Sequence, residues 1–224
     1  MATNATDELQ LEMAALPSAG SKPKLTRTGK ILLGVTGATF VAVTAITTPF
    51  VVPALRKICL PYVPATTEQV QNVLSVLGGH AKGRRLIDLG SGDGRIAIEA
   101  ARHGFCAEGI ELNPWLVLFS RYRARREGLH RDTKFHTRDL WKHDLSSYDD
   151  IVVFGVDCMM EPLRLKLVQE MGDTCRVVAC RFPVPSCEPA HTAGEGLDTV
   201  WLYTKSDLLR SVRNLKSELP SHIH

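Results

Sequence analysis

The chain has 224 residues, of which 44% are hydrophobic and 23% charged, and its formal net charge is +3. This composition is typical of a globular protein with one domain and additional segments. A charge of +3 is too small to indicate a nucleic-acid-binding protein. The six cysteines form no Cys-x-x-Cys pair and no cluster with zinc-site spacing. We therefore predict reduced thiols in an intracellular compartment, several of them buried, and no metal site.

The N-terminal part combines a polar tail with an uncharged segment. Residues 1–30 are polar and rich in small residues, and we predict that they are largely disordered. Residues 31–52 contain no charged side chain, and as a helix they would measure roughly 33 Å, enough to cross a hydrocarbon core of about 30 Å. We predict a single-pass membrane anchor whose end is interrupted by Pro49; a buried core helix and a signal sequence are the alternatives. Basic residues flank both ends, so the orientation stays open.

A linker and a short helix are expected next. Residues 53–67 are predicted to link the anchor to a folded domain of residues 68–204, because closely spaced prolines prevent a regular helix. The order Thr66-Thr67-Glu68-Gln69 is that of a helix-capping box. Apolar residues then recur at helical spacing until Gly78, which predicts a helix packed on a sheet. Residues 205–224 are polar with few apolar anchors, and we predict a mobile tail.

The most informative stretch is residues 86–95, where an apolar run containing Asp88 leads into Gly90, Gly92 and Gly94. An amphipathic segment follows, so the order predicts a strand, a tight turn and a helix whose backbone can approach a ligand closely. The turn lacks the Gly-Lys-Ser/Thr of a phosphate-binding loop. Its third glycine comes one residue earlier than in the dinucleotide fingerprint. This spacing resembles motif I of the S-adenosylmethionine-dependent methyltransferases; a plain structural turn is the alternative.

A second signal follows about 20 residues later, where Glu111 ends another short apolar run. In nucleotide-binding folds an acid at this place accepts hydrogen bonds from ribose hydroxyls, and a solvated acid is the alternative. Asn113 and Pro114 are typical of a helix N-cap and first helical position, and the helix is expected to reach Glu127. Its four arginines are predicted to form a solvated basic face, or else a surface for anionic lipid headgroups. These are Arg121, Arg123, Arg125 and Arg126.

Alternation of strands and helices continues to the end of the domain. Further strands are predicted over residues 134–137, 150–156, 176–181 and 199–203. A helix is expected to begin at Pro162 and to end near Met171. Strands that alternate with helices predict an α/β fold with a doubly wound, mostly parallel sheet.

In such a sheet, ligands bind beyond the carboxyl ends of the strands. The residues expected to contact a cofactor there are Asp88, Gly90, Ser91, Gly92, Gly94, Glu111, Leu112, Asn113, Asp139 and Leu140. Glu111 would bind the ribose, and Asp139 would accept from the adenine amino group, with Leu140 and Trp141 near the ring. A helix-capping Asp139 and a core Trp141 are the alternatives. No dedicated catalytic base is evident; Asp157 is a weak candidate, and a solvated loop acid is the simpler interpretation.

The end of the fourth predicted strand bears on the substrate class. Phe154-Gly155-Val156-Asp157 lacks the Asn/Asp-Pro-Pro-Tyr/Phe pattern with which nucleobase-amine methyltransferases hold a planar amino group. This absence argues against a nucleic-acid substrate.

Six segments together carry a more specific resemblance. They are residues 52–57 (VPALRK), 61–66 (PYVPAT), 88–95 (DLGSGDGR), 111–117 (ELNPWLV), 139–142 (DLWK) and 194–201 (GEGLDTVW). Over roughly residues 31–204 the chain resembles the mitochondrial, membrane-anchored lysine methyltransferases, and most closely the ATP synthase c-subunit lysine N-methyltransferase family. That family has tryptophan where Cys187 and Arg125 stand here, so details of the substrate pocket near Cys187 stay open.

The resemblance implies a Rossmann-like class I methyltransferase fold with S-adenosyl-L-methionine as cofactor. It implies methylation, up to trimethylation, of a lysine in the c-subunit of mitochondrial ATP synthase, which would promote the function of that synthase. It also implies a single-pass anchor in the inner mitochondrial membrane, at the cristae, and a role of the hydrophobic segment and linker in targeting and activity. The sister family acts on the adenine nucleotide translocase, which is an alternative substrate.

Two other function classes stay open at this point. One is a dinucleotide-dependent oxidoreductase, against which the glycine spacing argues. The other is a non-catalytic membrane scaffold that keeps a nucleotide-binding fold.

Overall fold

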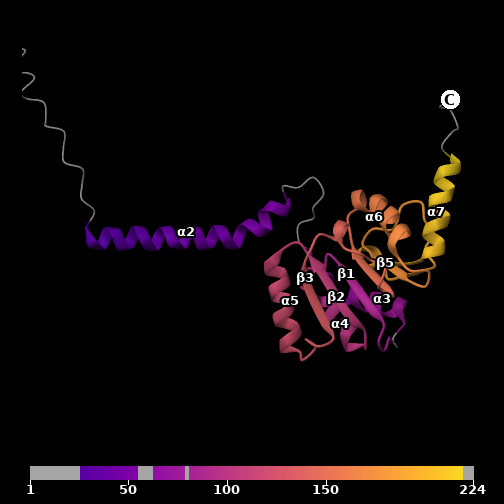
Figure 1. Ribbon diagram of the computed structural model, residues 1–224, viewed down its shortest axis with the longest axis horizontal. Coiled ribbons are helices and arrows are strands. Elements are labelled where there is room, and N and C mark those ends of the chain that lie inside the picture. The colour runs from indigo at the N-terminus through magenta and orange to yellow at the C-terminus, as the bar shows by residue number, and fades with distance from the viewer. Residues whose placement is uncertain (1–25, 55–62, 79–80, 219–224) are drawn as a thin grey trace, which may run out of the picture. The chain divides into compact units, whose positions relative to one another are not determined.

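The computed structural model describes residues 26–54, 63–78 and 81–218 (Figure 1). The expectations for residues 1–25, for most of the linker and for the last six residues fall outside this part of the chain. The chain divides into two units, residues 1–44 and residues 45–224, and each is considered by itself.

The first unit contains most of helix α2 (Arg27–Ala54). Within its first 22 residues, the most apolar 18-residue window has a mean hydropathy of 1.8, and none of that window is buried. Length and composition therefore suffice to cross a membrane. Two threonine hydroxyls inside the helix donate to carbonyl oxygens one turn earlier, at 2.9 and 2.8 Å, so these polar groups are satisfied without water. The expected helix is confirmed, although it begins four residues earlier and continues past Pro49, because one lost hydrogen bond does not end a helix.

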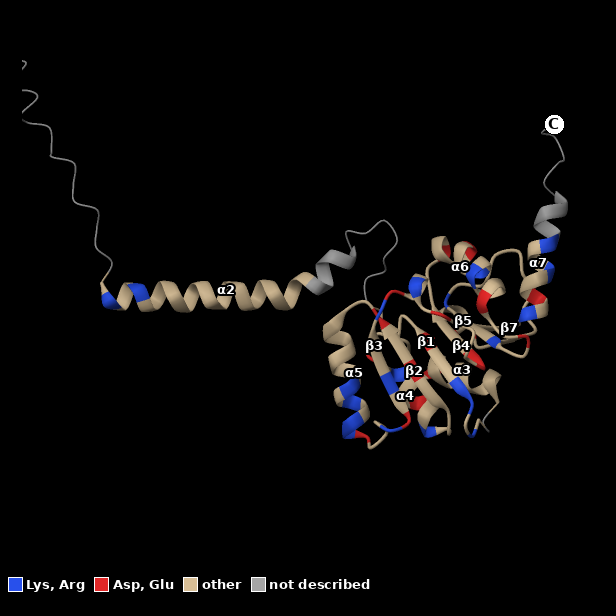
Figure 2. Ribbon diagram, viewed as in Figure 1, with Lys and Arg blue, Asp and Glu red and all other residues tan. Residues whose placement is uncertain are grey.

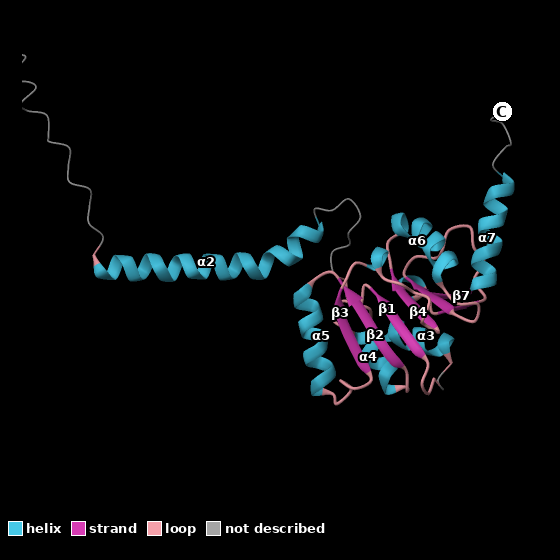
Figure 3. Ribbon diagram, viewed as in Figure 1, coloured by secondary structure: helices cyan, strands magenta, loops and turns pink. Residues whose placement is uncertain are grey.

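The second unit is built on a seven-stranded sheet with the order β3-β2-β1-β4-β5-β7-β6 (Figures 1 and 3). The strands are β1 (Arg85–Leu89), β2 (Cys106–Glu111), β3 (Thr133–Thr137), β4 (Asp150–Phe154), β5 (Arg176–Cys180), β6 (His191–Ala193) and β7 (Val200–Thr204). β1 to β5 are parallel, whereas β7 is antiparallel to β5 and β6, which confirms a mostly parallel sheet. The strand order reverses between β1 and β4, where open α/β sheets bind their ligands.

Helices cover both faces of this sheet (Figure 3). One face carries α3 (Thr67–Leu77), α4 (Arg95–Arg102) and α5 (Pro114–Arg126); the other carries α6 (Asp157–Glu170) and α7 (Lys205–Glu218). Alternate strand residues point to opposite faces, so Leu86 belongs to the first core cluster and Ile87 to the second. The result is the expected α/β fold of three layers.

Helix α3 begins as the capping motif predicts. The Thr66 hydroxyl accepts a hydrogen bond from the backbone N–H of Gln69 at 3.0 Å. The side-chain amide of Gln69 donates to the carbonyl oxygen of Leu197 at 2.9 Å, in the short 3₁₀ helix η2 (Gly196–Asp198). The capping residues therefore also tie α3 to the segment before β7.

Three expectations about the C-terminal half were wrong. Helix α6 begins at Asp157 and not at Pro162, because the buried Met160 fixes the extra turn to the core; β4 accordingly ends at Phe154. The polar segment between the strands predicted over residues 176–181 and 199–203, where we expected a loop, contains strand β6, which pairs with β7. Residues expected as a mobile tail form α7, where Leu208 is fully buried.

The cysteine expectation can be checked for the described residues. Cys106, Cys158, Cys175, Cys180 and Cys187 are all free thiols. Cys175 and Cys180 are buried, and burial raises the pKa of the Cys175 thiol to about 12. The prediction that several thiols are buried is thus confirmed for these two.

The amino ends of three strands are joined by one buried carboxylate. Asp150, with a side chain that is 0% exposed, accepts from Arg84 Nε at 2.7 Å and pairs with Arg176 at 2.8 Å. We expect Asp150→Ala to lower the free energy of unfolding by about 3 kcal/mol, because two partly buried guanidinium groups lose their partner. Denaturant titration would measure this. Glu99→Ala, which removes a more exposed pair with Arg102, is the control, and an equal loss in both variants would contradict the prediction.

Candidate active site

The glycine turn lies at the carboxyl end of β1 and is fixed to the end of β2. The backbone N–H groups of Gly90 and Ser91 both donate to the carbonyl oxygen of Ile110, at 2.9 and 3.0 Å. The turn closes through a bond from Gly94 N–H to the carbonyl oxygen of Ser91, at 2.8 Å, and α4 then begins at Arg95. The predicted strand, turn and helix are therefore present, and the turn borders the switch point between β1 and β4.

Glu111 lies at the end of β2, beside this turn. Its Oε2 accepts from the backbone N–H of Gly92 at 3.1 Å. Its Oε1 accepts from the N–H groups of Leu112 and Asn113, at 2.7 and 2.9 Å. A carboxylate can accept about four hydrogen bonds, so three backbone donors orient the group and leave capacity for a hydroxyl ligand. The spacing between the glycines and Glu111 in the sequence thus correctly predicted that Glu111 lies beside the turn.

Asp88 presents a buried carboxyl group without a partner. Its side chain is 1% exposed, and among the described residues neither carboxylate oxygen has a hydrogen-bond partner. Burial, together with the nearby charges of Glu111 and Asp93, raises its pKa to about 8. The hydroxyl of Ser91 is likewise buried and unpaired. Such orphaned polar atoms are costly, and they fit a polar or cationic group of a ligand.

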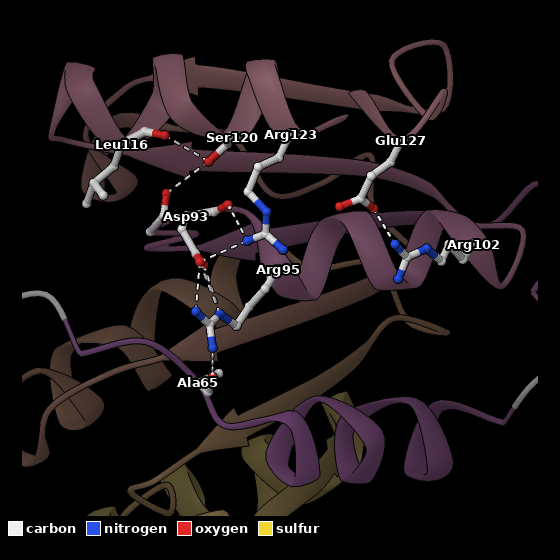
Figure 4. Close-up of polar contacts among 9 residues, drawn as sticks. Ala65, Asp93, Arg95, Arg102, Leu116, Ser120, Arg123 and Glu127 are labelled. Atoms are coloured by element: carbon white, nitrogen blue, oxygen red, sulfur yellow. Dashed lines mark hydrogen bonds and ion pairs between the residues drawn. The ribbon is translucent and has the colours of Figure 1, made fainter. Parts of the chain in front are cut away.

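Asp93, inside the turn, organises contacts that the sequence did not predict (Figure 4). Its carboxylate accepts from Arg95 and from Arg123 of α5, each at 2.8 Å. Partial burial opposes ionisation of Asp93, but the hydrogen bond from Arg95 and the charges of both arginines outweigh it, so its pKa lies below the ordinary value. Arg95 also donates to the carbonyl oxygen of Ala65. The turn is therefore joined to α5 and to the segment before α3.

Helix α5 approaches the turn closely. The Ser120 hydroxyl lies 3.0 Å from the carbonyl oxygen of Gly92 (Figure 4). A Cβ atom on Gly94 would lie only 2.8 Å from the ring of Phe135 and from Cβ of Ser120. Gly94 also has φ +77°, a conformation that residues with a side chain rarely adopt. The third glycine is thus required by both packing and backbone geometry.

We expect Gly94→Ala to lower the free energy of unfolding by about 3 kcal/mol, the combined cost of a left-handed alanine and of overpacking. Thermal denaturation would measure the loss. Gly128→Ala is a matched control, because Gly128 has φ +76° with nothing within 4 Å of the added Cβ. Equal losses in the two variants would show that packing around Gly94 has no part in the effect.

The ends of β3 and β4 complete the edge of the sheet. The backbone N–H of Arg138 donates to the carbonyl oxygen of Glu111 at 3.1 Å, which brings Asp139 next to the end of β2. Asp139 caps the 3₁₀ helix η1 (Leu140–Lys142) by accepting from Trp141 N–H at 3.0 Å. Asp139 therefore caps a helix, as the alternative interpretation predicts. Trp141 is 39% exposed and is therefore not a core residue. Adenine contact by Asp139 and Leu140 stays a prediction.

On the other side of the turn, β4 leads into α6. Asp157 is the first residue of α6 and is exposed. Arg181, which follows β5, has φ +72° and holds its guanidinium 5.9 Å from the ring centre of Phe154. A left-handed arginine at this edge is a strained feature of the kind found at functional sites.

The four arginines of α5 differ in their partners. Arg121 donates to the carbonyl oxygen of Phe135 at 2.6 Å, and Arg123 binds Asp93. The predicted solvated basic face is therefore only partly correct, because Arg123 is half-buried against the turn and the exposed Arg121 also fastens the helix to β3. Arg125 and Arg126 are exposed, as expected.

Known families match both parts of the chain. Residues 88–191 match the family model described as the ANTKMT methyltransferase domain. Residues 24–56 match the model of the N-terminal domain of the ATP synthase c-subunit lysine N-methyltransferases. The second match covers the whole of α2, and the first begins at Asp88.

Curated relatives are similar over most of the chain. The ATP synthase c-subunit lysine N-methyltransferase of Xenopus laevis is 50% identical, over 99% of this chain and 97% of the relative. The Homo sapiens protein of the same name is 56% identical, over 80% and 76%. The adenine nucleotide translocase lysine N-methyltransferase of Mus musculus is 42% identical, over 67% of each chain.

A solved structure shares the fold. An RNA methyltransferase from Salinibacter ruber, in complex with S-adenosyl-L-homocysteine, superimposes with a TM-score of 0.60 at 30% identity. The match covers 63% of this chain and 93% of that structure. The Rossmann-like methyltransferase fold expected from the sequence is therefore confirmed.

Proposed function

Because this chain belongs to the ATP synthase c-subunit lysine N-methyltransferase family, we propose that it methylates a lysine of the ATP synthase c-subunit with S-adenosyl-L-methionine as donor. The observation that supports the cofactor is the pairing of a glycine turn with Glu111 at the switch point of the sheet. Trimethylation is the degree that the family resemblance implies.

The residues at the edge fit the parts of this cofactor. The unpartnered carboxylate of Asp88 suits the ammonium group of the methionine portion, and Glu111 suits the ribose hydroxyls. The adenine would lie by Asp139 and Leu140, and the backbone of Gly90 to Gly94 would pass the bound molecule closely. When bound, the sulfonium supplies an activated methyl group. The protein aligns the amine and excludes water.

A lysine must be neutral to accept a methyl group, and its ordinary pKa is about 10.4. We propose that no side chain acts as a base and that the amine loses its proton to solvent. Asp157, the weak candidate, is exposed at the start of α6. The methylation rate is then expected to rise about tenfold per pH unit below the pKa of the bound lysine, in the wild type and in Asp157→Asn alike. A rate drop of about 100-fold in Asp157→Asn, with this slope present in the variant but not in the wild type, would assign Asp157 as the base, because only the variant would then depend on proton loss to solvent.

Membrane attachment is the second part of the proposal. Helix α2 has the length and hydropathy of a single span, and the family implies the inner mitochondrial membrane, at the cristae. A tether of this kind raises the effective concentration of the domain near a substrate in the same membrane.

The test uses the full chain with labelled S-adenosyl-L-methionine and mitochondrial membranes from cells that lack the enzyme. A labelled protein of c-subunit size is expected. Label on the adenine nucleotide translocase would keep the chemistry but move the substrate to the sister activity, which the 42% identity to that relative makes the second candidate. Cofactor binding without transfer to any membrane protein would favour a scaffold. Nicotinamide binding without S-adenosyl-L-methionine binding would favour the oxidoreductase.

A further inference from the structure

Helix α5 carries large apolar side chains on the side that faces away from the sheet. Trp115, Leu118, Phe119 and Tyr122 are 38%, 57%, 48% and 58% exposed. At about 100° per residue, these four side chains and those of Arg125 and Arg126 fall within a sector of about 120°. We call these six residues the docking face. The opposite side of the helix, with Leu116, Val117, Ser120 and Ala124, is already buried.

A helix that is apolar on both sides normally has neighbours on both. In the part of the chain that the structure describes, the four apolar side chains of the docking face stay exposed to this extent. Its four apolar side chains are contiguous over two turns, and contiguous exposed apolar surface marks interaction sites. Three of the four are aromatic, the side-chain type enriched where proteins meet the interface of a bilayer.

The charges on the docking face have one sign. α5 contains no acidic residue, and Arg125 and Arg126 lie exposed in its last turn. Figure 2 shows the first turns of α5 without charge and the last turns blue. Arg121 and Arg123 are engaged with Phe135 and Asp93, so two arginines remain for an external partner. Aromatic and aliphatic residues beside arginines match a bilayer surface with anionic headgroups.

The connection to α2 makes a membrane the nearest surface. Only residues 49–62 separate the candidate span from Val63, and fourteen residues reach at most about 50 Å. If α2 crosses a bilayer, as proposed above, the domain stays within this distance of it. A docking face that binds lipid only weakly on its own can then stay bound, because the tether makes the binding intramolecular and raises its effective concentration.

We propose that the docking face binds the surface of the anchoring membrane by inserting Trp115, Leu118, Phe119 and Tyr122 below anionic headgroups. α5 begins at Pro114, three residues after Glu111, so its first turn lies at the same edge of the sheet as the candidate active site. Docking therefore brings that edge to the membrane, where a membrane-embedded substrate presents its lysine. This consequence rests on the proposed function, whereas lipid binding by the face does not.

The test reconstitutes the full chain into vesicles whose phosphatidylcholine carries brominated acyl chains, with and without anionic phosphatidylglycerol. Bromine quenches tryptophan only within the acyl region. The chain has three tryptophans, so Trp141→Phe with Trp201→Phe leaves Trp115 as the reporter. Trp115→Phe with Trp141→Phe leaves Trp201 on β7 as the matched control in an equally anchored protein. Quenching of Trp115 and not of Trp201 is expected.

Variants separate docking from anchoring. Phe119→Glu with Tyr122→Glu, at exposed positions, is expected to abolish the quenching of Trp115. Arg125→Ser or Arg126→Ser is expected to lower the equilibrium constant for docking about fivefold each on anionic vesicles and to have no effect on neutral ones. The affinity for S-adenosyl-L-methionine is measured separately on Phe119→Glu in the otherwise unchanged chain. It tests the fold and the proposed function independently of docking.

Two results would overturn the proposal. One is an anchored protein in which Trp115 is no more quenched than Trp201. The other is a protection of Trp115 from quenching by aqueous acrylamide that increases with protein concentration and persists in detergent. Such protection would identify a second copy of the chain as the occupant of the docking face.

Discussion

Glu111→Ala is expected to weaken the binding of S-adenosyl-L-methionine by about 10- to 100-fold, because one hydrogen bond from a ribose hydroxyl to this charged group contributes about 1.5–3 kcal/mol. Three backbone N–H groups already orient this carboxylate, so little reorganisation is needed on binding. Isothermal titration calorimetry with the full chain in detergent would measure the affinity. Transfer to the c-subunit should fall in parallel at low cofactor concentration.

Two comparisons distinguish a ligand contact from a structural role. Glu108→Ala removes another carboxylate from β2, one that accepts from the Tyr148 hydroxyl at 3.0 Å, and is expected to keep the affinity. Glu111→Gln keeps the shape but lacks the charge, and should fall between wild type and alanine. A lower melting temperature of Glu111→Ala with unchanged affinity would mean that Glu111 only supports the turn.

The parts of the site that the sequence predicted are those with local signals. Gly90 to Gly94 is a turn because consecutive residues dictate it, and Thr66 and Asn113 cap helices through atoms two or three residues away. Glu111 was found because a strand, a helix and a second strand bring the ends of β1 and β2 together at a regular spacing.

The parts that were missed depend on contacts between distant residues. Nothing near Arg123 in the sequence indicates that it binds Asp93, thirty residues earlier. Helix α7 was mistaken for a tail because its few apolar residues suffice only once Leu208 is buried and Ser211 accepts from Arg164. Pro162 is a helix-start signal that tertiary packing overrides, since Met160, two residues earlier, is buried in the core as part of the helix.

The role of Asp88 can be recognised only from the sequence and the fold together, and the burial of its carboxyl group costs folding free energy. An apolar strand with one acid is visible in the sequence, but only the fold shows that the acid is buried and has no partner among the described residues. Its pKa of about 8 lies above the ordinary value of 3.8, so between these pH values the folded chain holds a proton that the unfolded chain releases. The free energy of unfolding therefore falls as pH rises from about 4 to 8. A cationic ligand group would remove this penalty.

Asp88→Asn is accordingly expected to stabilise the cofactor-free protein while impairing its function. Near pH 4 both proteins should unfold with similar free energies, and by pH 8 the variant should be more stable by a few kcal/mol, because it has no proton to lose. Its affinity for S-adenosyl-L-methionine should be lower by about 10- to 100-fold, since a charged hydrogen bond is lost. The wild-type affinity should rise with pH between 6 and 8, by at most about tenfold per unit, as Asp88 must ionise to meet the ammonium group, and the variant should show no such slope. Melting temperatures and calorimetric titrations across this pH range would measure both effects. A variant that is less stable than the wild type at pH 8, with an unchanged pH dependence of binding, would mean that Asp88 finds another partner and does not hold the cofactor.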